Sequence, residues 1–593
     1  MNRISILTLL AVSFLLTSGF AAESAADRVY RNGVVFTADA RGSIAEAVAI
    51  REGLIVYVGK DAGVAPYIGP STKVTDLKGG CVMPGLVDGH MHPVEGGLKL
   101  EGCSLDYESL TIAQLQEKVQ ACLDKTKSQE PDGWLEVVNW FQESMRPAGT
   151  KTSRATLDAL KTSRPVIVRS SFGHTVLANS RALALAKITR ATADPPGGKI
   201  WRDADGNPSG VLEDSAFAVF STLVPESTPE ENIAAAKAAQ KALARQGVTS
   251  FLDAVAAHED LAAFTALQAA GELTVRAHFA PLITVPEGSN PEKAVAHVVA
   301  DRKQYDRGAI VAIPGVTVRN AKLFLDGVIA APALTGSMVE PYRTNAGTAG
   351  SPHWVDGQSR GPDVYFPAKA LAEILVRLAR AGIDPHMHAD GDGAVRAGLD
   401  AVAAMRKEIN GADIRPALAH CEIVTPADFG RFKLLDTTPV LSMQWEKPAG
   451  DTMGLKNYFG PERMKILEPG GLLAAAGARI AFGSDWPVDP LNEWFALKVG
   501  VTRTNAPDAA PEFHGRLGDD PGLSREAVLR AATINAAYEL HEDDVTGSLE
   551  TGKLADLIVL DCNPLKIPAE DIANVKVMET VVGGQTVYAS AGH

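Results

Sequence analysis

MPGLVDGHMH, residues 83–92, is a short apolar run that begins with Met83, Pro84 and Gly85 and ends on a His-x-His pair. Such a run is typical of a buried strand in a parallel sheet. In an extended chain the side chains of His90 and His92 point to the same side, so the two imidazoles can bind one cation together. Two solvent-exposed loop histidines are the alternative interpretation of this pair.

Seven further strand-like segments follow, separated by stretches with helical spacing of apolar residues. Strands that alternate with helices predict an α/β fold, here a (β/α)₈ TIM-like barrel over residues 84–540. Residues 93–240, between the first two strands, form a large insertion. The strands are expected at MPGLVDGH (83–90), GVTSFLDA (247–254), TVRAHFAPL (274–282), NAKLFLDG (320–327), IDPHMHA (383–389), PALAHCE (416–422), PVLSMQW (439–445) and RIAFGSDWP (479–487).

The two ends of the chain have a different pattern, in which apolar and polar residues alternate over short runs between turns. RVYRNGVVFT (28–37) and VKVMETVVGGQTVY (575–588) are examples. This alternation predicts half-buried strands and hairpins. We therefore expect one small β-sandwich domain built from residues 22–83 and 541–593.

Residues 1–21 have the pattern of a secretory signal. Arg3 precedes an apolar stretch too short to span a bilayer, and Gly19 and Ala21 occupy the small-residue positions of a cleavage site. We expect an exported protein, periplasmic or secreted. No later segment offers about 18 uninterrupted apolar residues, so no membrane anchor is expected after cleavage.

Charge and cysteine content exclude some classes of protein. The formal net charge of -14 argues against nucleic acid as a partner, because binding phosphates requires a basic face. A small-molecule substrate fits, and the oligomeric state stays open, with a homo-oligomer allowed.

None of the 5 cysteines forms a CxxC pair, which leaves no support for a zinc finger. Cys103 and Cys122 either form a local disulfide or stay two unrelated thiols.

Later strands also carry metal-ligand side chains at their C-terminal ends, where barrel enzymes place their active sites. His386 and His388 form a second His-x-His pair, one of which can be a decoy, and His420 ends the next strand. Asp485 follows the last strand and can bind a metal and accept a proton from activated water. Each residue has a structural alternative, such as a core histidine or a helix-capping aspartate. Their joint order nevertheless predicts one metal site that includes His90.

Lys322 lies among apolar residues in the fourth strand. A buried amine is costly unless it is paired or neutralised. The residues alone favour an ordinary lysine that pairs with Asp326 or reaches solvent. Carboxylation by CO₂, which would create an anionic ligand able to bridge two metals, is the other chemical route.

These motifs resemble the amidohydrolase superfamily, and within it the YtcJ-like branch (amidohydrolase family 3), which includes N-substituted formamide deformylase. The resemblance covers almost the whole chain after the signal segment. It rests on MPGLVDGHMHP, GHTVLANSRAL, GGKIWRDADGNPSGVLED, AKLFLDG, HADGDGA, AHCE, SMQW, FGSDWPV, AATINAAYELH and GSLETGKLADLIVLD.

The resemblance implies a barrel with a β-sandwich domain and a site for one or two divalent metals, zinc or similar. His388 is preferred over His386, because the family motif reads His-Ala-x-Gly-Asp. Asp392 completes that motif and is implied to orient His388 or substrate. His174 and Asn179 match a substrate-facing segment. The implied metal ligands are His90, His92, Lys322 in carboxylated form, His388, His420 and Asp485.

We expect hydrolysis of a non-peptide C–N bond in a small molecule, with Asp485 as the catalytic proton carrier. An esterase or lactonase on the same site, a mononuclear site with an unmodified Lys322, and a secreted non-catalytic regulatory or binding protein are the alternatives. Two stretches, GVIAAPALTG and HADGDGA, depart from the branch and leave the substrate open. The insertion is expected to cover the site. Core packing is the favoured interpretation for Trp134 and Trp140.

Overall fold

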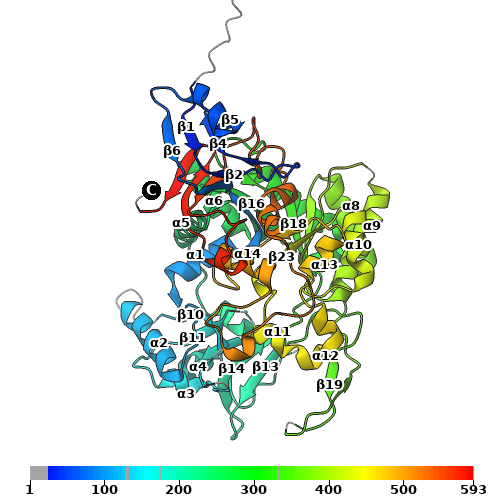
Figure 1. The fold of residues 1–593 in the computed structure, drawn as a ribbon. Helices are drawn as coiled ribbons and strands as arrows, with labels where there is room; N and C mark the ends of the chain where they lie inside the picture. Colours follow the sequence, from blue (N-terminus) through cyan, green and yellow to red (C-terminus); the bar gives the residue numbers. More distant parts are fainter. Residues whose placement is uncertain are drawn as a thin grey trace, which may run out of the picture.

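A computed structural model describes residues 25–591, apart from 127–132, 143–144, 148, 172, 174, 196–197, 332, 349 and 410. The expected signal segment, residues 1–21, lies outside the described residues. The fold is mixed α/β (Figure 1). Strands from both chain ends gather at one end of the molecule, and the insertion lies at the other.

The middle of the chain forms two parallel sheets, and each of the eight expected strands is present. One sheet has the order β17-β16-β15-β8 and the other β18-β21-β22-β23-β24. Their strands are β8 (Leu86–Met91), β15 (Val248–Ala256), β16 (Arg276–Pro281), β17 (Val316–Thr317), β18 (Asn320–Phe324), β21 (Asp384–Ala389), β22 (Ala417–His420), β23 (Thr438–Leu441) and β24 (Ala481–Phe482).

The two parallel sheets contact each other at two places. On one side a bridge pairs Leu282 with Lys322, and the amide of Ile283 donates to the Lys322 carbonyl at 2.8 Å. On the other side the amide of Asp485 donates to the His90 carbonyl at 2.7 Å. The ends of β18 and β8, which carry candidate ligands, are therefore held by both sheets.

Helices follow these strands and place their apolar faces on them. The helix α5 shows how the sequence sets the limits, because Thr228 and Glu231 form a capping box at its start and Gly247 ends it at a φ of 91°. The main helices are α5 (Pro229–Gln246), α6 (His258–Ala270), α7 (Pro291–Tyr305), α8 (Ala368–Arg380), α9 (Asp392–Glu408), α10 (Phe429–Leu434), α13 (Gly470–Ala475), α14 (Glu493–Thr502), α15 (Arg525–Arg530) and α16 (Ala536–Glu539).

Both chain ends contribute to the terminal sheets. One sheet has the order β5-β4-β1-β6, and the other, β27-β26-β25-β7-β2-β3, mixes strands from the two ends. The sheets share an apolar core that includes Tyr30, Val48 and Val559. The strands are β1 (Arg28–Arg31), β2 (Val34–Phe36), β3 (Ile44–Ala45), β4 (Ala47–Arg51), β5 (Leu54–Gly59), β6 (Lys73–Asp76), β7 (Cys81–Pro84), β25 (Leu557–Leu560), β26 (Val577–Val582) and β27 (Gln585–Ala589).

The insertion has a sheet and a core of its own. Its six strands have the order β13-β14-β12-β11-β10-β9. They are β9 (Cys103–Ser104), β10 (Leu135–Trp140), β11 (Val166–Ser170), β12 (Thr175–Ala178), β13 (Gly198–Arg202) and β14 (Pro208–Asp214), flanked by α2 (Ile112–Thr126), α3 (Arg154–Asp158) and α4 (Ser180–Leu185). The helix α1 (Pro93–Glu101) leads into it from the first candidate ligands.

Two smaller observations bear on the sequence expectations. Trp140 is fully buried and donates to the Met145 sulfur at 3.4 Å, and Trp134 packs on Phe220, which confirms the core interpretation for both. No helix in the described part of the chain is long and apolar enough to cross a membrane.

Candidate metal centre

The candidate ligands meet at the C-terminal ends of the parallel strands. His90 belongs to β8, His388 to β21 and His420 to β22, and Asp485 follows β24. In the register of the second sheet, Phe324 pairs with His388 and Ala389 pairs with His420, which brings neighbouring strands to the same level. The side chains form two groups that have metal-ligand spacing: His90 with His92 and Asp485, and His388 with Asp390 and His420.

The first group is tied together by Asp485. Its Oδ1 lies 3.0 Å from His92 Nε2 and 3.5 Å from His90 Nε2. Asp485 has a φ of 54°, in the left-handed region that side chains rarely adopt. The Asp88 carboxylate accepts the amides of His90 and Ser484, each at 3.0 Å, and so holds the two strand ends together.

His386 does not join either group. Its Nε2 lies 2.8 Å from His90 Nδ1, and its Nδ1 lies 2.9 Å from Glu539 Oε1. If His90 offers Nε2 to a metal, its Nδ1–H donates to His386, whose own Nδ1–H donates to Glu539. Carboxylate–imidazole contacts of this kind fix the tautomer and ring orientation of a metal ligand. The His-x-His pair of β21 thus contains one candidate ligand and one residue that supports a ligand on β8.

The second group is held mainly by ring packing. The His420 ring lies 4.6 Å from that of His90 and 4.8 Å from that of His388 between centroids, and it stacks on Trp445 at 5.2 Å. His420 has a φ of 72°. Its Nδ1 and the Oδ1 of Asp390 are buried, and neither has a hydrogen-bond partner among the described residues.

Lys322 lies against the first group and is 1% exposed. Its Nζ lies 3.4 Å from His90 Nε2 and 4.6 Å above the Phe324 ring. Within the described residues no carboxylate forms an ion pair with it, so the expected pairing with Asp326 is not formed. Asp326 instead accepts the amides of Ser337, Asp390 and Gly391.

Burial controls the charge of the metal-free centre. Desolvation, with the positive charge of Lys322 next, holds the pKa of His90 well below its usual range and lowers that of His388 to about 3. Desolvation lowers the pKa of Lys322 to about 8, against the attraction of nearby aspartates. His92 is the exception: burial opposes its charge, but hydrogen bonds to Asp253 and Asp485 raise its pKa to about 10. Uncharged imidazoles are the form that binds metals.

A family model described as "Amidohydrolase family" matches residues 73–588. The chain belongs to the amidohydrolase family.

Similar proteins match over nearly their whole length. "Protein LONG AFTER FAR-RED 3" of Arabidopsis thaliana is 27% identical over 574 residues, 95% of this chain and 92% of that protein. "N-substituted formamide deformylase" of Arthrobacter pascens is 24% identical over 95% of this chain and 99% of that protein. "Putative amidohydrolase YtcJ" of Bacillus subtilis is 25% identical over 94% of this chain and 99% of that protein.

Solved structures share the fold. A metal-dependent hydrolase from Pyrococcus horikoshii superimposes with a TM-score of 0.69 at 21% identity, over 91% of this chain and 99% of that one. An adenosine deaminase from Xanthomonas campestris with bound Zn gives 0.52 at 14% identity, over 95% of this chain and 94% of that one. The expected resemblance to the YtcJ-like amidohydrolases is confirmed.

The residues matched to substrate contacts in this family lie in different surroundings. His174 is outside the described residues. Asn179 caps α4: its Oδ1 accepts the amides of Val166 and Ala182, and its Nδ2 donates to the Arg164 carbonyl, so its amide group is committed to the fold. Asn179 therefore lies in the insertion core and not among the residues of the centre.

Asp392 does not orient His388. Its carboxylate accepts the Val339 amide and the Thr425 hydroxyl, both at 2.7 Å, and so ties the long loop after β18 to the loop after β22. The partners that sequence reasoning missed are Asp253, Asp390 and Glu539. Asp253 and Asp390 do carry a usable signal, because Asp253 lies in the C-terminal half of β15 and Asp390 directly follows β21.

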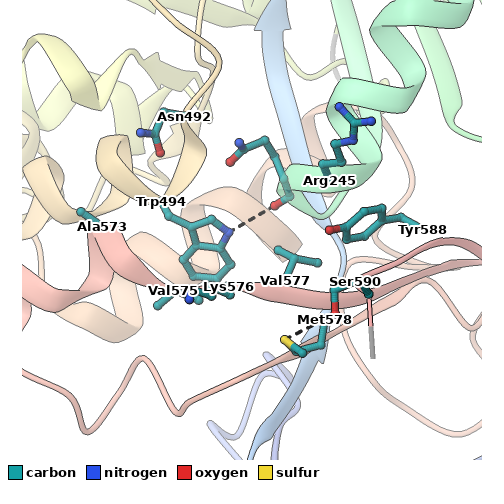
Figure 2. Close-up of a pocket in the computed structure, with 12 residues that line it drawn as sticks. Arg245, Asn492, Trp494, Ala573, Val575, Lys576, Val577, Met578, Tyr588 and Ser590 are labelled. Carbon is teal, nitrogen blue, oxygen red and sulfur yellow. Dashed lines mark hydrogen bonds between the residues drawn. The ribbon is translucent and has the colours of Figure 1, made fainter. Parts of the chain in front are cut away.

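Two cavities lie apart from the centre. One, of about 420 Å³, is lined by Arg245, Trp494 and Tyr588 where α5 and α14 face the C-terminal strands, and the Trp494 indole donates to the Gln246 carbonyl there (Figure 2). The other, of about 650 Å³, is lined by residues that include Cys103 and Cys122. Both thiols are free in the structure. None of the described candidate ligands lines either cavity.

Proposed function

We propose that this amidohydrolase is a metal-dependent hydrolase that cleaves a non-peptide C–N bond in a small molecule. One observation carries the proposal: two groups of buried nitrogen and oxygen ligands meet at the C-terminal ends of two parallel sheets. Active sites of barrel enzymes lie at that end of their strands.

The residues fit a divalent metal. His420 Nδ1 and Asp390 Oδ1 are buried without a partner, an arrangement that costs free energy unless a cation or water satisfies it. Imidazole and carboxylate are common zinc ligands, and the similar adenosine deaminase contains Zn. Under this proposal His90, His92 and Asp485 hold one ion, and His388 and His420 hold a second. Lys322 would bridge the two ions in carboxylated form.

The chemistry divides between the metal and the chain. A bound divalent ion would act as a Lewis acid and would lower the pKa of water towards about 7. Asp485, whose Oδ1 contacts both His90 and His92, would accept the proton of the attacking water and return it to the leaving amine. His92 would orient that carboxylate, and Asp88 would hold the strand ends that present both groups.

The choice of a C–N bond rests on the family and on the similar N-substituted formamide deformylase. Metal-activated water does not by itself distinguish an amide from an ester or a lactone.

The finer architecture belongs to the same proposal: the two parallel sheets close into a (β/α)₈ barrel, and the terminal sheets form a β-sandwich domain. The two contacts between the parallel sheets support it. We also propose export through residues 1–21.

The test uses the purified full chain after metal removal and reconstitution. We expect bound zinc, together with turnover of N-formyl or N-acyl amines that disappears on chelation and returns with metal. Turnover restricted to esters or lactones would contradict the C–N assignment alone. A reconstituted chain without bound metal would contradict the hydrolase proposal itself.

A further inference from the structure

We propose that Asp390 is a metal ligand that completes a second cation position with His388 and His420. This inference rests on the proposed function, because it assigns a further residue to that site. The carboxylate occupies the variable position of the His-Ala-x-Gly-Asp motif, so its presence is a property of this chain and not of the motif.

The geometry places the Asp390 carboxylate within the group. One ring nitrogen of His388, one ring nitrogen of His420 and one carboxylate oxygen of Asp390 all lie within 4.8 Å of one another. Two ligand atoms that each lie about 2.0 to 2.2 Å from one cation are at most about 4.0 to 4.4 Å apart, so atoms within 4.8 Å of one another are close to the separation that one ion requires. The spacing therefore allows one ion to contact all three side chains.

The position of Asp390 is set by the backbone around it. Its amide donates to Asp326 Oδ1 at 3.1 Å, and its carbonyl accepts the Ile423 amide at 3.2 Å. These bonds hold the residue between the ends of β18 and β22. The carboxylate is thus delivered to the group by a fixed backbone and does not depend on a mobile loop.

Two unsatisfied atoms point to a cation there. Asp390 is 1% exposed and His420 is 3% exposed. Asp390 Oδ1 and His420 Nδ1 both lack a hydrogen-bond partner in the described part of the chain, although Asp390 also shares a hydrogen bond with Glu422. A buried acceptor without a donor is costly, and a divalent ion would satisfy both atoms at once.

His388 has a tautomer that suits the same ion. Its Nε2 lies 3.0 Å from the Gly327 carbonyl, which accepts and cannot donate, so Nε2 carries the proton. Nδ1 then carries the lone pair. A metal-binding histidine commonly donates its second ring nitrogen to a carbonyl in this way. Two imidazoles and one carboxylate form a ligand set known from catalytic zinc sites.

The decisive experiment counts and locates zinc in the full chain. We expect the wild type to bind two ions and Asp390→Asn to bind one. The affinity of the lost position should fall by more than about 100-fold, because even changes to outer partners weaken metal binding by about 10- to 100-fold. Asp392→Asn is the matched control, since it removes a buried carboxylate two residues away whose hydrogen bonds are to Val339 and Thr425. It should keep both ions.

A direct measurement covers the case in which Asp390→Asn folds poorly. Anomalous scattering at the zinc edge from wild-type crystals should give a peak in contact with Asp390, His388 and His420. A peak confined to His90, His92 and Asp485 would overturn the inference and leave the hydrolase proposal intact. Two ions retained by Asp390→Asn at unchanged affinity would also overturn it. A wild type that binds no zinc would contradict the proposed function as well.

Discussion

The two halves of the metal centre hold their histidines by different means. On the β8 side, His90 is bonded through His386 to Glu539, and His92 is bonded to Asp485. On the β21 and β22 side, His388 donates to the Gly327 carbonyl, whereas His420 is held by stacking on Trp445 and has a ring nitrogen with no partner among the described residues. A hydrogen bond fixes which ring nitrogen carries the proton before a metal binds. Stacking fixes only the plane of the ring and leaves the tautomer open. The comparison suggests that the first half is preorganised and that the second half is completed by its ion.

The largest effect is expected from removing the carboxylate of Asp485, which belongs to the preorganised half on the β8 side. Asp485→Asn keeps the shape but loses the proton acceptor and one anionic ligand. We expect kcat/KM to fall by about 10³-fold or more, since positioned acid–base groups contribute about 10²- to 10⁴-fold. Steady-state kinetics at matched zinc occupancy measure it. Activity within threefold of wild type, about 0.65 kcal/mol, would refute the role of Asp485.

Lys322 lies against the preorganised half and offers a pH test. Its folded pKa of about 8 lies below the value of 10.5 for a free lysine. Because the unfolded chain keeps the proton longer, the free energy of unfolding of the metal-free protein should rise between pH 8 and 10.5. That difference corresponds to about 3 kcal/mol.

Lys322→Met should abolish this rise and should stabilise the metal-free protein below pH 8. Denaturant unfolding at a series of pH values, with chelator present, measures both effects. If the wild type and Lys322→Met show the same pH dependence, Lys322 does not titrate in this range.

The support behind His90 is expected to have an intermediate effect. Glu539→Gln replaces the carboxyl group at the end of the Glu539–His386–His90 chain with an amide, and we expect zinc affinity to fall by about 10- to 100-fold. The chain supplies a matched control in the His278–Glu542 pair, which is equally buried, bonded at 2.9 Å and away from the candidate ligands. Competition with a chelating dye compares Glu539→Gln with Glu542→Gln. Equal zinc affinities for Glu539→Gln and Glu542→Gln would show that His386 does not support the metal centre.

The smallest expected effect comes from the packed half. Trp445→Leu removes the surface on which His420 stacks while keeping an apolar side chain. Aromatic pairs contribute about 0.5 to 1.5 kcal/mol, so the affinity for the second ion should fall by about 2- to 10-fold. Zinc titration resolves this loss, and the first ion should be unaffected. A larger loss at the first ion would show that the two halves are not separately supported.

The strands and the main ligands were predictable because they have local signals. The parallel strands are short apolar runs, and the candidate ligands lie in or just after four of them, so the order of His90, His420 and Asp485 along the chain predicted their place in space. The barrel pattern also explains why His386 was hard to assign. Both histidines of β21 point to the same face, and only the distance to His90 separates their roles.

The partners of the ligands could not be read in the same way. Glu539 contacts His386 across 153 positions of sequence, and nothing around either residue signals the other. For Asn179 a local signal was present but the resemblance pointed elsewhere. The residue precedes a helix and has the side chain of a helix cap, whereas the family motif implied a contact with substrate. Local capping chemistry accounts for that residue without any ligand.

The mixed terminal sheet has a consequence for how the protein is made. Strand β7 pairs with β2 on one side and with β25 on the other, and Arg28 and Tyr30 both contact Glu579. During synthesis one edge of β7 stays unpaired until β25, near the end of the chain, has been made. Such an edge can pair with another molecule, which makes incomplete chains prone to aggregate. A ribosome that stalls before residue 557 would release a protein in which β7 pairs with β2 but lacks β25 on its other edge.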